Sequence, residues 1–298
     1  MTTRSLPELS TLPIRTLTPD DLTACLDLAE DRGWSREEHK WRLLLTAGQG
    51  YGIDAPDGNG GLIGAYVLTD YTGEYACVSM VLVAERYARR GLGRRLMRHA
   101  IEASGDAAPF LQATDNGRPL YEQLGFRAVG ATTMLTGTFA PDGTDGTDVP
   151  DGTDRVSVRR ASAADMRAVL ALDAEVFGTD RTELLARLPA FADRFVVADD
   201  AAGGITGFAA RWPNGPTDVF GPVVAADLAT AQALIADLGA DAGERVRFDV
   251  DSRHPELERW LRAHGLSGDY RCTLMVHTAP DIPGDISRRF APYSVALG

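Results

Sequence analysis

The chain has 298 residues, 44% of them hydrophobic, which is enough to fill two cores of ordinary size. No apolar run approaches the roughly 18 residues of a membrane span, and the apolar share is too high for a disordered chain. The 30 basic and 42 acidic residues leave a net charge of −12, which opposes general binding to nucleic acid or anionic lipid. We expect a globular protein whose electrostatic field attracts a cationic small molecule. We expect no nucleic-acid or membrane partner.

The cysteines and the first residues bear on the compartment. Cys25, Cys77 and Cys272 are odd in number and far apart, which favours a reducing compartment and argues against a disulfide framework or a zinc site. Residues 1–13 hold neither a seven-residue apolar stretch nor a small-residue cleavage site, so they do not resemble a secretory signal. We predict a cytoplasmic protein without a metal.

An Asp, Gly and Thr repeat divides the chain. In residues 141–154 only Val149 could enter a core, which predicts an acidic linker between domains at 1–140 and 155–298. The alternative, a calcium loop, would need a distal glutamate and a regular ligand spacing that this stretch lacks. A solvated linker is the favoured interpretation.

The two halves begin and end alike. Residues 18–21, Thr-Pro-Asp-Asp, follow a short predicted strand and form a helix-capping pattern, and residues 162–165, Ser-Ala-Ala-Asp, repeat it 144 positions later. Near each end lies a similar helix-to-strand corner, at residues 120–126 and 260–266, each with one glycine. Matching features in the same order indicate an internal duplication.

A glycine turn carries the clearest chemistry. Residues 78–83 read as a buried strand, and Gly91 and Gly93 then open a helix. Unpaired backbone N–H groups at such a turn, together with the helix dipole, form a pocket for a phosphate or pyrophosphate. The turn is not a P-loop, because no Gly-Lys-Ser/Thr follows, and a dinucleotide fingerprint would need glycine in place of Leu96.

Two motifs here resemble the GNAT superfamily of acetyl-CoA-dependent N-acetyltransferases. The run from Ala88 through Gly91 to Gly93 is similar to the family's pyrophosphate turn, Gln/Arg-x-x-Gly-x-Gly/Ala, and departs from it at Ala88. Residues 120–126, Leu-Tyr-Glu-Gln-Leu-Gly-Phe, resemble a second family segment. Thr114 stands where the family often has an asparagine, so one contact to the coenzyme is expected to be missing.

The resemblance implies a fold and a coenzyme site. The fold would be α/β (α+β), with two tandem GNAT-like domains, each a mixed, mainly antiparallel twisted sheet flanked by helices. Acetyl-CoA would be the acyl donor, held by the strand backbone and the glycine turn, and Tyr121 would give a proton to the leaving thiolate. The residues implied in coenzyme binding are Val81, Leu82, Val83, Arg89, Arg90, Gly91, Leu92, Gly93, Arg94, Asn116 and Tyr121.

The general base stays open at this stage. Glu74 just precedes the central strand, where the family often places a carboxylate or a water relay, although an exposed hairpin glutamate is the ordinary interpretation. Some tandem GNAT enzymes use a terminal carboxylate, which would be that of Gly298, although a tail that only docks on the core is the simpler alternative. The apolar residues of the tail, 287–298, predict that it packs back near the cleft.

The second half has no matching glycine turn. Residues 220–227 lead into a predicted helix at 228–238 without a second glycine or an arginine, so we expect one coenzyme site, in the first half. The chain resembles actinobacterial-type tandem GNAT proteins with a degenerate second domain, some of which acetylate aminoglycosides. Residues 155–298 would then form the acceptor-side wall of a cleft lined by carboxylates.

The predicted function is acetyl transfer to a primary amine of a small cationic molecule. The amine would attack the thioester directly in a ternary complex, and the protein would be a monomer or a homodimer. An aminoglycoside or aminosugar, and with it antibiotic resistance, is one option for the acceptor. The alternative is a non-catalytic acetyl-CoA-binding sensor or structural protein, which the departures at Ala88 and Thr114 allow. Tyr121 favours the enzyme.

Overall fold

The computed structural model describes residues 8–56, 60–141 and 156–298. Within these ranges thirteen strands form a mixed, mainly antiparallel arrangement flanked by helices, as predicted. The strands of both halves join in one continuous sheet, where a separate sheet in each domain was expected. Apart from Pro141, the predicted linker lies outside the described residues. None of the described helices combines the length and the apolar character needed to cross a bilayer.

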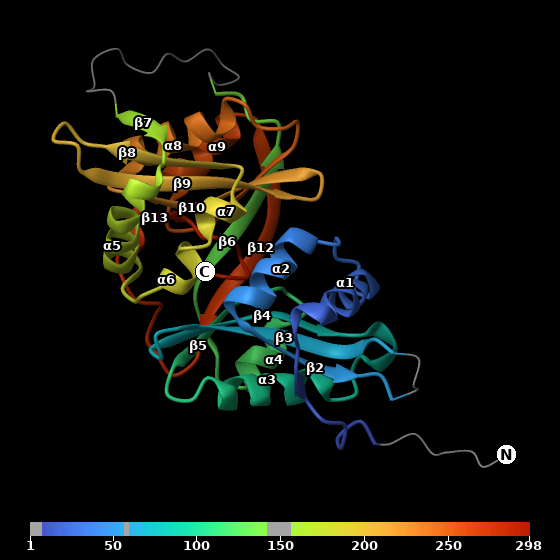
Figure 1. Ribbon diagram of the computed structural model, residues 1–298. Coiled ribbons are helices and arrows are strands. Elements are labelled where there is room, and N and C mark those ends of the chain that lie inside the picture. Colours follow the sequence, from blue (N-terminus) through green and yellow to red (C-terminus); the bar gives the residue numbers. More distant parts are fainter. Residues whose placement is uncertain (1–7, 57–59, 142–155) are drawn as a thin grey trace.

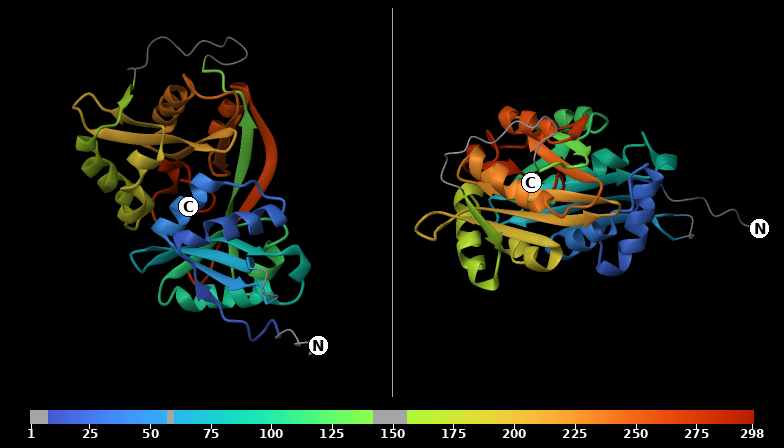
Figure 2. Two further views of the ribbon diagram at one scale, coloured as in Figure 1. Left: turned by 45° about the vertical axis from the view of Figure 1, so that its right-hand side comes forward. Right: turned by 90° about the horizontal axis from the view of Figure 1, so that it is seen from above.

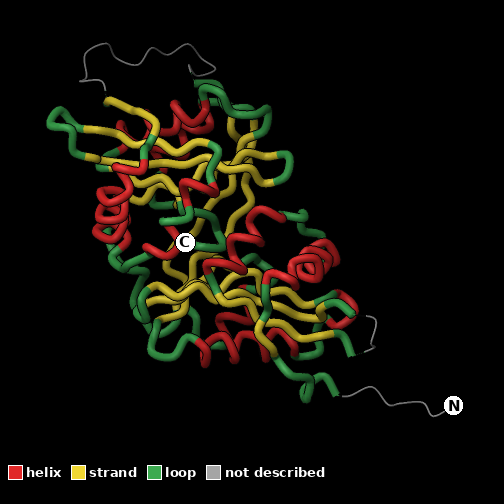
Figure 3. The backbone as a smooth tube through the Cα atoms, viewed as in Figure 1, coloured by secondary structure: helices red, strands yellow, loops and turns green. Residues whose placement is uncertain are grey.

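In the first half, α1 and α2 pack on one face of the sheet and α3 packs on the other (Figures 1 and 3). The strands follow the spatial order β1-β2-β3-β4-β5, and β4 and β5 form its parallel pair. The elements of this half are β1 (Arg15–Thr16), α1 (Leu22–Asp31), α2 (Glu38–Ala47), β2 (Gln49–Asp54), β3 (Leu62–Tyr71), β4 (Tyr75–Val83), α3 (Leu92–Ala103), β5 (Ala108–Ala113), α4 (Arg118–Gln123) and β6 (Arg127–Gly137).

The second half repeats this order, with the strands β7-β8-β9-β10-β11 side by side and a parallel pair between β10 and β11. Its elements are β7 (Ser157–Arg160), α5 (Met166–Phe177), α6 (Thr182–Leu185), α7 (Leu188–Phe191), β8 (Arg194–Asp199), β9 (Ile205–Asn214), β10 (Thr217–Ala225), α8 (Leu228–Gly239), β11 (Val246–Asp251), α9 (Pro255–Ala263), β12 (Leu266–Val276) and β13 (Arg289–Ala291).

The predicted capping pattern forms in both halves. The backbone N–H of Thr18 donates to Asp21 Oδ2 at 2.9 Å, and that of Ser162 donates to Asp165 Oδ2 at 2.7 Å. In each case the pattern closes a short 3-10 turn that runs into the first helix of that half. The same local geometry therefore follows from the same residue spacing.

A repeated arginine network supports the duplication further. Arg15 pairs with Asp21 at 2.7 Å and with Asp54 on β2 at 2.8 Å. Arg159 pairs in the same way with the capping aspartate of its own half at 2.8 Å and with Asp199 on β8 at 2.6 Å. Each arginine thus ties the first turn of its half to the neighbouring strand.

The two halves exchange their last strands. Strand β12, from the second half, lies between β5 and β6, while β6, from the first half, pairs with β11. Figures 1 and 2 show β6 and β12 as two long strands that run from one half into the other. The predicted domain limits stay a prediction, but both halves depend on a strand that the other supplies.

The end of the chain packs between the halves, as predicted (Figure 1). Phe290, Tyr293 and Leu297 are buried, and Tyr71 on β3 donates its hydroxyl to the carbonyl of Leu297. The thiol of Cys77 lies 3.5 Å from the carbonyl of Ala296. The tail is therefore part of the core that joins the halves.

Candidate active site

The central feature of the first half is a splay between β4 and β5. The two strands pair in parallel only from Tyr75 to Cys77, so residues 78–83 present an edge that no described strand covers. At Met80, whose φ is 51°, the register between β4 and β3 shifts, which marks a bulge. An uncovered strand edge offers backbone N–H and C=O groups to an extended amide chain.

The glycine turn lies at the end of β4. Gly91 has a φ of +86° and caps α3, and a Cβ placed on it would meet nothing within 4 Å. The backbone conformation therefore favours glycine there, and the space in front of it is open. A Cβ on Gly93 would lie 3.3 Å from Leu120 and 3.9 Å from Val83, so α3, α4 and β4 meet at this point. The first N–H groups of α3 have no partner within the helix.

A groove of about 550 Å³ along α3 is lined by arginines. Arg90, Arg94, Arg95 and Arg98 all face it. Arg95 is held by a backbone carbonyl of the N-terminal segment at 3.1 Å, and the Arg90 guanidinium lies 5.4 Å from the centre of the Tyr87 ring. A helix N-terminus beside several guanidinium groups suits phosphates.

The other residues predicted to bind the coenzyme lie on the same elements. Arg89 and Asn116 are exposed, Val81 and Val83 are half-buried, and Leu82 and Leu92 are buried. Leu82 and Leu92 can therefore contribute to coenzyme binding through their backbone groups and not through their side chains.

Tyr121 is buried in α4. Its ring packs near Phe126, with the ring centres 6.1 Å apart, and its hydroxyl lies 3.0 Å from the Cβ position of Gly117. Burial raises the pKa of Tyr121 to about 12, so the hydroxyl keeps its proton at neutral pH. The hydroxyl has no hydrogen-bond partner in the part of the chain that the structure describes. Tyr121 is not among the residues that line the arginine groove or the cleft beside residues 78–80, so its role as a proton donor stays a prediction.

Glu74 lies in the exposed hairpin between β3 and β4. Its carbonyl accepts the N–H of Ala108 at 2.9 Å, so the residue fixes the start of the parallel pair. Met80 lies six positions further along the chain, which corresponds to about 20 Å at the rise of an extended strand. Met80 helps to line a cleft between the two halves, and Glu74 is not among the described residues of that lining.

This cleft has a volume of about 340 Å³ and borders β4 at the bulge. The first half lines it with the loop between α1 and α2, with residues 78–80 and with the end of β5, where Thr114 lies. The second half contributes β11, β12 and the tail residues Val295 and Ala296. The sequence predicted the strand and a cleft walled by the second half, but not the side chains that line this cleft, because they come from segments far apart in the chain.

Buried charges form the floor of the cleft. Lys40 pairs with Glu37, Asn214 donates to Glu37, and Arg247 lies 3.9 Å from Glu37 while making a bidentate pair with Asp249 at 2.8 and 2.9 Å. Burial lowers the pKa of Lys40. Burial also acts to raise the pKa of Glu37, but the charge and hydrogen bond of Lys40 and the hydrogen bond of Asn214 outweigh it, and the pKa lies below its ordinary value.

The expected lining of carboxylates is therefore not found. Among the described residues that line the cleft, Glu37 is the one carboxylate, and its negative charge is already paired with Lys40. Lys40 and Arg247 face Glu37 in the lining, and the second positive charge is offset by Asp249, which pairs with Arg247 from outside the lining.

The thiols are not suited to carry an acetyl group. Cys25, Cys77 and Cys272 are all buried, and burial raises their pKa values to about 12, 12 and 11. Only the thiolate is a good nucleophile, so even Cys272, which lines the cleft, is inert at neutral pH. This chemistry favours direct transfer over an acyl-cysteine.

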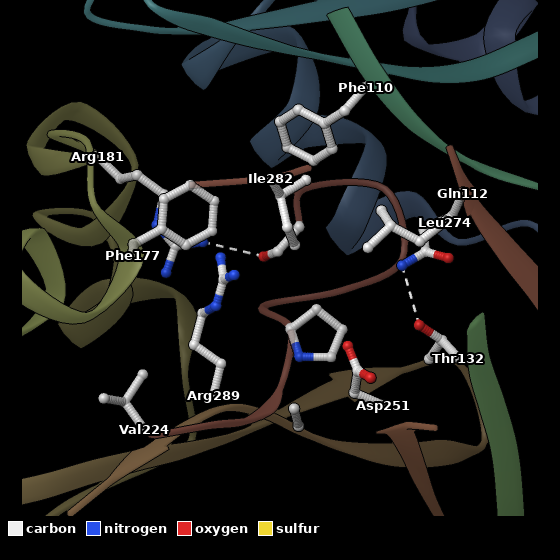
Figure 4. Close-up of a pocket in the computed structure, with 13 residues that line it drawn as sticks. Phe110, Gln112, Thr132, Phe177, Arg181, Val224, Asp251, Leu274, Ile282 and Arg289 are labelled. Carbon is white, nitrogen blue, oxygen red and sulfur yellow. Dashed lines mark hydrogen bonds between the residues drawn. The ribbon is translucent and has the colours of Figure 1, made fainter. Parts of the chain in front are cut away.

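A second, smaller cavity of about 40 Å³ is lined by residues of both halves (Figure 4). Gly298 belongs to its lining. Its carbonyl accepts a hydrogen bond of 3.0 Å from Arg181, which also forms a buried pair with Asp173 at 2.7 Å. Gly298 does not belong to the lining described for the larger cleft. Its contacts are those of a docked tail.

The equivalent splay in the second half is filled. Strands β10 and β11 pair in parallel from Asp218 to Phe220, but Val223 and Val224 of β10 pair instead with β13. At the start of α8, Asp227 accepts the backbone N–H of Thr230 at 2.8 Å. The strand edge and the helix N-terminus that are open in the first half are both occupied here by the chain itself.

Comparison with known proteins fits this geometry. A GNAT acetyltransferase domain model matches residues 54–128, and a second one matches residues 169–291. The uncharacterised N-acetyltransferase YitH of Bacillus subtilis strain 168 is 27% identical over 254 residues, which are 84% of this chain and 86% of that protein.

Solved structures share the fold over both halves. A putative acetyltransferase from Pyrococcus horikoshii has a TM-score of 0.79 at 17% identity and covers 100% of this chain and 99% of its own. A tandem GNAT protein from the clavulanic acid biosynthesis pathway has a TM-score of 0.61 at 18% identity and covers 89% of this chain and 98% of its own. The chain belongs to the GNAT acetyltransferases and is a tandem-GNAT N-acetyltransferase.

Proposed function

We propose that the first half binds acetyl-CoA at the β4 and β5 splay and that the chain transfers its acetyl group to a primary amine held in the cleft. The observation that carries this proposal is the position of one strand segment. Residues 78–83 have an uncovered edge toward β5, and residues 78–80 also line the cleft. An acyl donor on that edge and an amine in the cleft would meet at the bulge at Met80. Aminoglycosides and aminosugars are one class of such amines.

The chain's own groups can meet the needs of the reaction. The uncovered edge of β4 would pair with the amides of the pantetheine arm and offer an N–H to the carbonyl oxygen, while the N-terminus of α3 at Gly91 would hold the pyrophosphate. Bound acetyl-CoA supplies an activated thioester. The amine attacks directly, since the three thiols stay protonated.

Tyr121 would act as the proton donor. Its hydroxyl is neutral because burial raises its pKa to about 12, so it can donate a hydrogen bond and then a proton to the departing thiolate. The attacking amine releases one proton, so the number of protons is conserved over the reaction. Neither Glu74 nor Gly298 lines the cleft as described, which leaves a water relay as the favoured route for that proton.

The test pairs Gly91→Asp with Gly203→Asp. Both glycines have left-handed φ values, +86° and +82°, with open space at the Cβ position, and aspartate tolerates that conformation. A carboxylate at Gly91 should repel the pyrophosphate and lower acetyl-CoA affinity about 100-fold in calorimetry, whereas Gly203→Asp should leave it unchanged. Equal affinity in both variants would contradict the assigned site.

Thiol release from acetyl-CoA is then measured with a panel of polyamines, amino acids, aminosugars, aminoglycosides and arylalkylamines. Release that depends on one class of amine and is lost in Gly91→Asp is the expected result. Tight coenzyme binding without release on any amine would favour the non-catalytic sensor.

A further inference from the structure

Two exposed aromatic side chains face the cleft. Trp34 is 37% exposed and Tyr270 is 52% exposed, and within the described residues these are the large hydrophobic side chains that solvent reaches most. Trp34 lies in the loop between α1 and α2, whereas Tyr270 lies on the exchanged strand β12. Both line the same cleft, although they come from opposite halves. Exposed aromatics gathered at one cavity indicate a ligand with an apolar surface.

The charged floor offers little to a polycation. Glu37 is held by Lys40, and Arg247 is held by Asp249. A ligand with several ammonium groups would approach the paired cations without a free carboxylate in the described lining to offset them. The cleft is therefore neutral, unlike the acidic chain as a whole.

Two acceptor atoms remain without partners beside the β4 bulge. The hydroxyl of Ser79 and the side-chain carbonyl oxygen of Gln112 are buried and accept no hydrogen bond from the described residues. Both residues line the cleft, and Ser79 is the last regularly paired residue before the bulge at Met80. Buried polar atoms are nearly always paired, so these two are suited to the N–H groups of a ligand.

Building on the proposed function, we infer that the acceptor is a primary amine carried on a flat aromatic body, of the arylalkylamine type, rather than a polycation. Its ring lies against Trp34 and Tyr270, and its nitrogen lies at the bulge near Ser79 and Gln112. A cleft of about 340 Å³ has the size of a small-molecule site.

The kinetic test compares 2-phenylethylamine and tryptamine with spermidine and kanamycin at saturating acetyl-CoA. The aromatic amines should have the highest kcat/KM. Trp34→Ala and Tyr270→Ala should raise the KM for 2-phenylethylamine about 5- to 10-fold, and Tyr270→Phe, which keeps the ring, should change it less than about twofold. A higher kcat/KM for spermidine or kanamycin, or an unchanged KM in Trp34→Ala, would overturn the inference.

Calorimetry separates this inference from the proposed function. We titrate 2-phenylethylamine into the full chain loaded with coenzyme A and repeat the titration with Trp34→Ala and Tyr270→Phe. Binding that is weakened by the first variant and kept by the second supports the aromatic cleft, even if no acetyl transfer occurs and the proposed reaction fails. If 2-phenylethylamine does not bind, the inference is wrong whichever amine is acetylated.

Discussion

The splays of the two halves differ in what covers them. Between β4 and β5 the strand edge beyond Cys77 is open and Gly91 leaves the N-terminus of α3 free. Between β10 and β11 the edge is paired with β13, and Asp227 caps α8. In the second half, contacts of the chain itself therefore fill the positions that correspond to the proposed coenzyme site, and the glycines of the turn are missing as well. Because β13 pairs with the edge of β10, that edge needs no coenzyme to satisfy its backbone groups.

Features that support the fold are repeated, while those that we assign to the proposed coenzyme site are not. Gly125 and Gly265 end α4 and α9 with nearly equal φ values, 93° and 94°. One turn before these glycines, however, the first half has Tyr121 where the second has Leu261. The comparison predicts that changes toward the second half's residues remove function and leave the fold.

The largest effect should come from separating the halves. Residues 1–140 alone lack β12 between β5 and β6, so both strands lose a partner and the fragment should fail to fold, as circular dichroism and size exclusion would show. As the control, residues 1–148 and 149–298 expressed together should assemble and bind acetyl-CoA. A soluble monomeric 1–140 fragment with a cooperative melt would break the argument from strand exchange.

Tyr121→Phe should reduce kcat about 100-fold for whichever amine is the substrate, because it keeps the ring and removes the proton donor. The acetyl-CoA dissociation constant should stay within about twofold, since the packing against Phe126 is kept. Tyr121→Leu, which copies Leu261, should lose at least as much activity, and Tyr51→Phe should lose none. Reduced coenzyme affinity with an unchanged kcat would mean that Tyr121 only packs.

The smallest effect should come from opening the cap of α8. Asp227→Ala removes the hydrogen bond to Thr230 and should lower the free energy of unfolding by about 1 kcal/mol in denaturant titration. Calorimetry should still give one acetyl-CoA per chain, because β13 continues to occupy the strand edge. Asp106→Ala serves as the exposed control. A second binding site in Asp227→Ala would show that the cap alone closes the second half.

The local structure of the elements that form the proposed coenzyme site could be predicted from the sequence. The strand at residues 78–83, the glycine turn and the Tyr121 segment lie close together in the chain, and each depends on neighbouring residues. A left-handed φ at Gly91 and a cap at Thr18 are set within a few positions. Such local rules also revealed the duplication.

The acceptor side was decided by the tertiary structure. Trp34, Lys40, Arg247 and Tyr270 meet in one cleft although more than 200 residues separate the first from the last. Glu74, which the sequence suggested as a base, lies in the hairpin before β4 and outside the described lining of the cleft. No local pattern shows which side chains from distant strands will share a cavity.

The sequence by itself determined the repeated elements, their caps and the glycine turn at Gly91, because helix ends and glycine turns depend on the residues beside them. Only the tertiary structure decided that β6 and β12 change places and that β13 fills the second splay. The backbone groups of any strand can pair with those of any other, so the choice of partner depends on how all the side chains pack together.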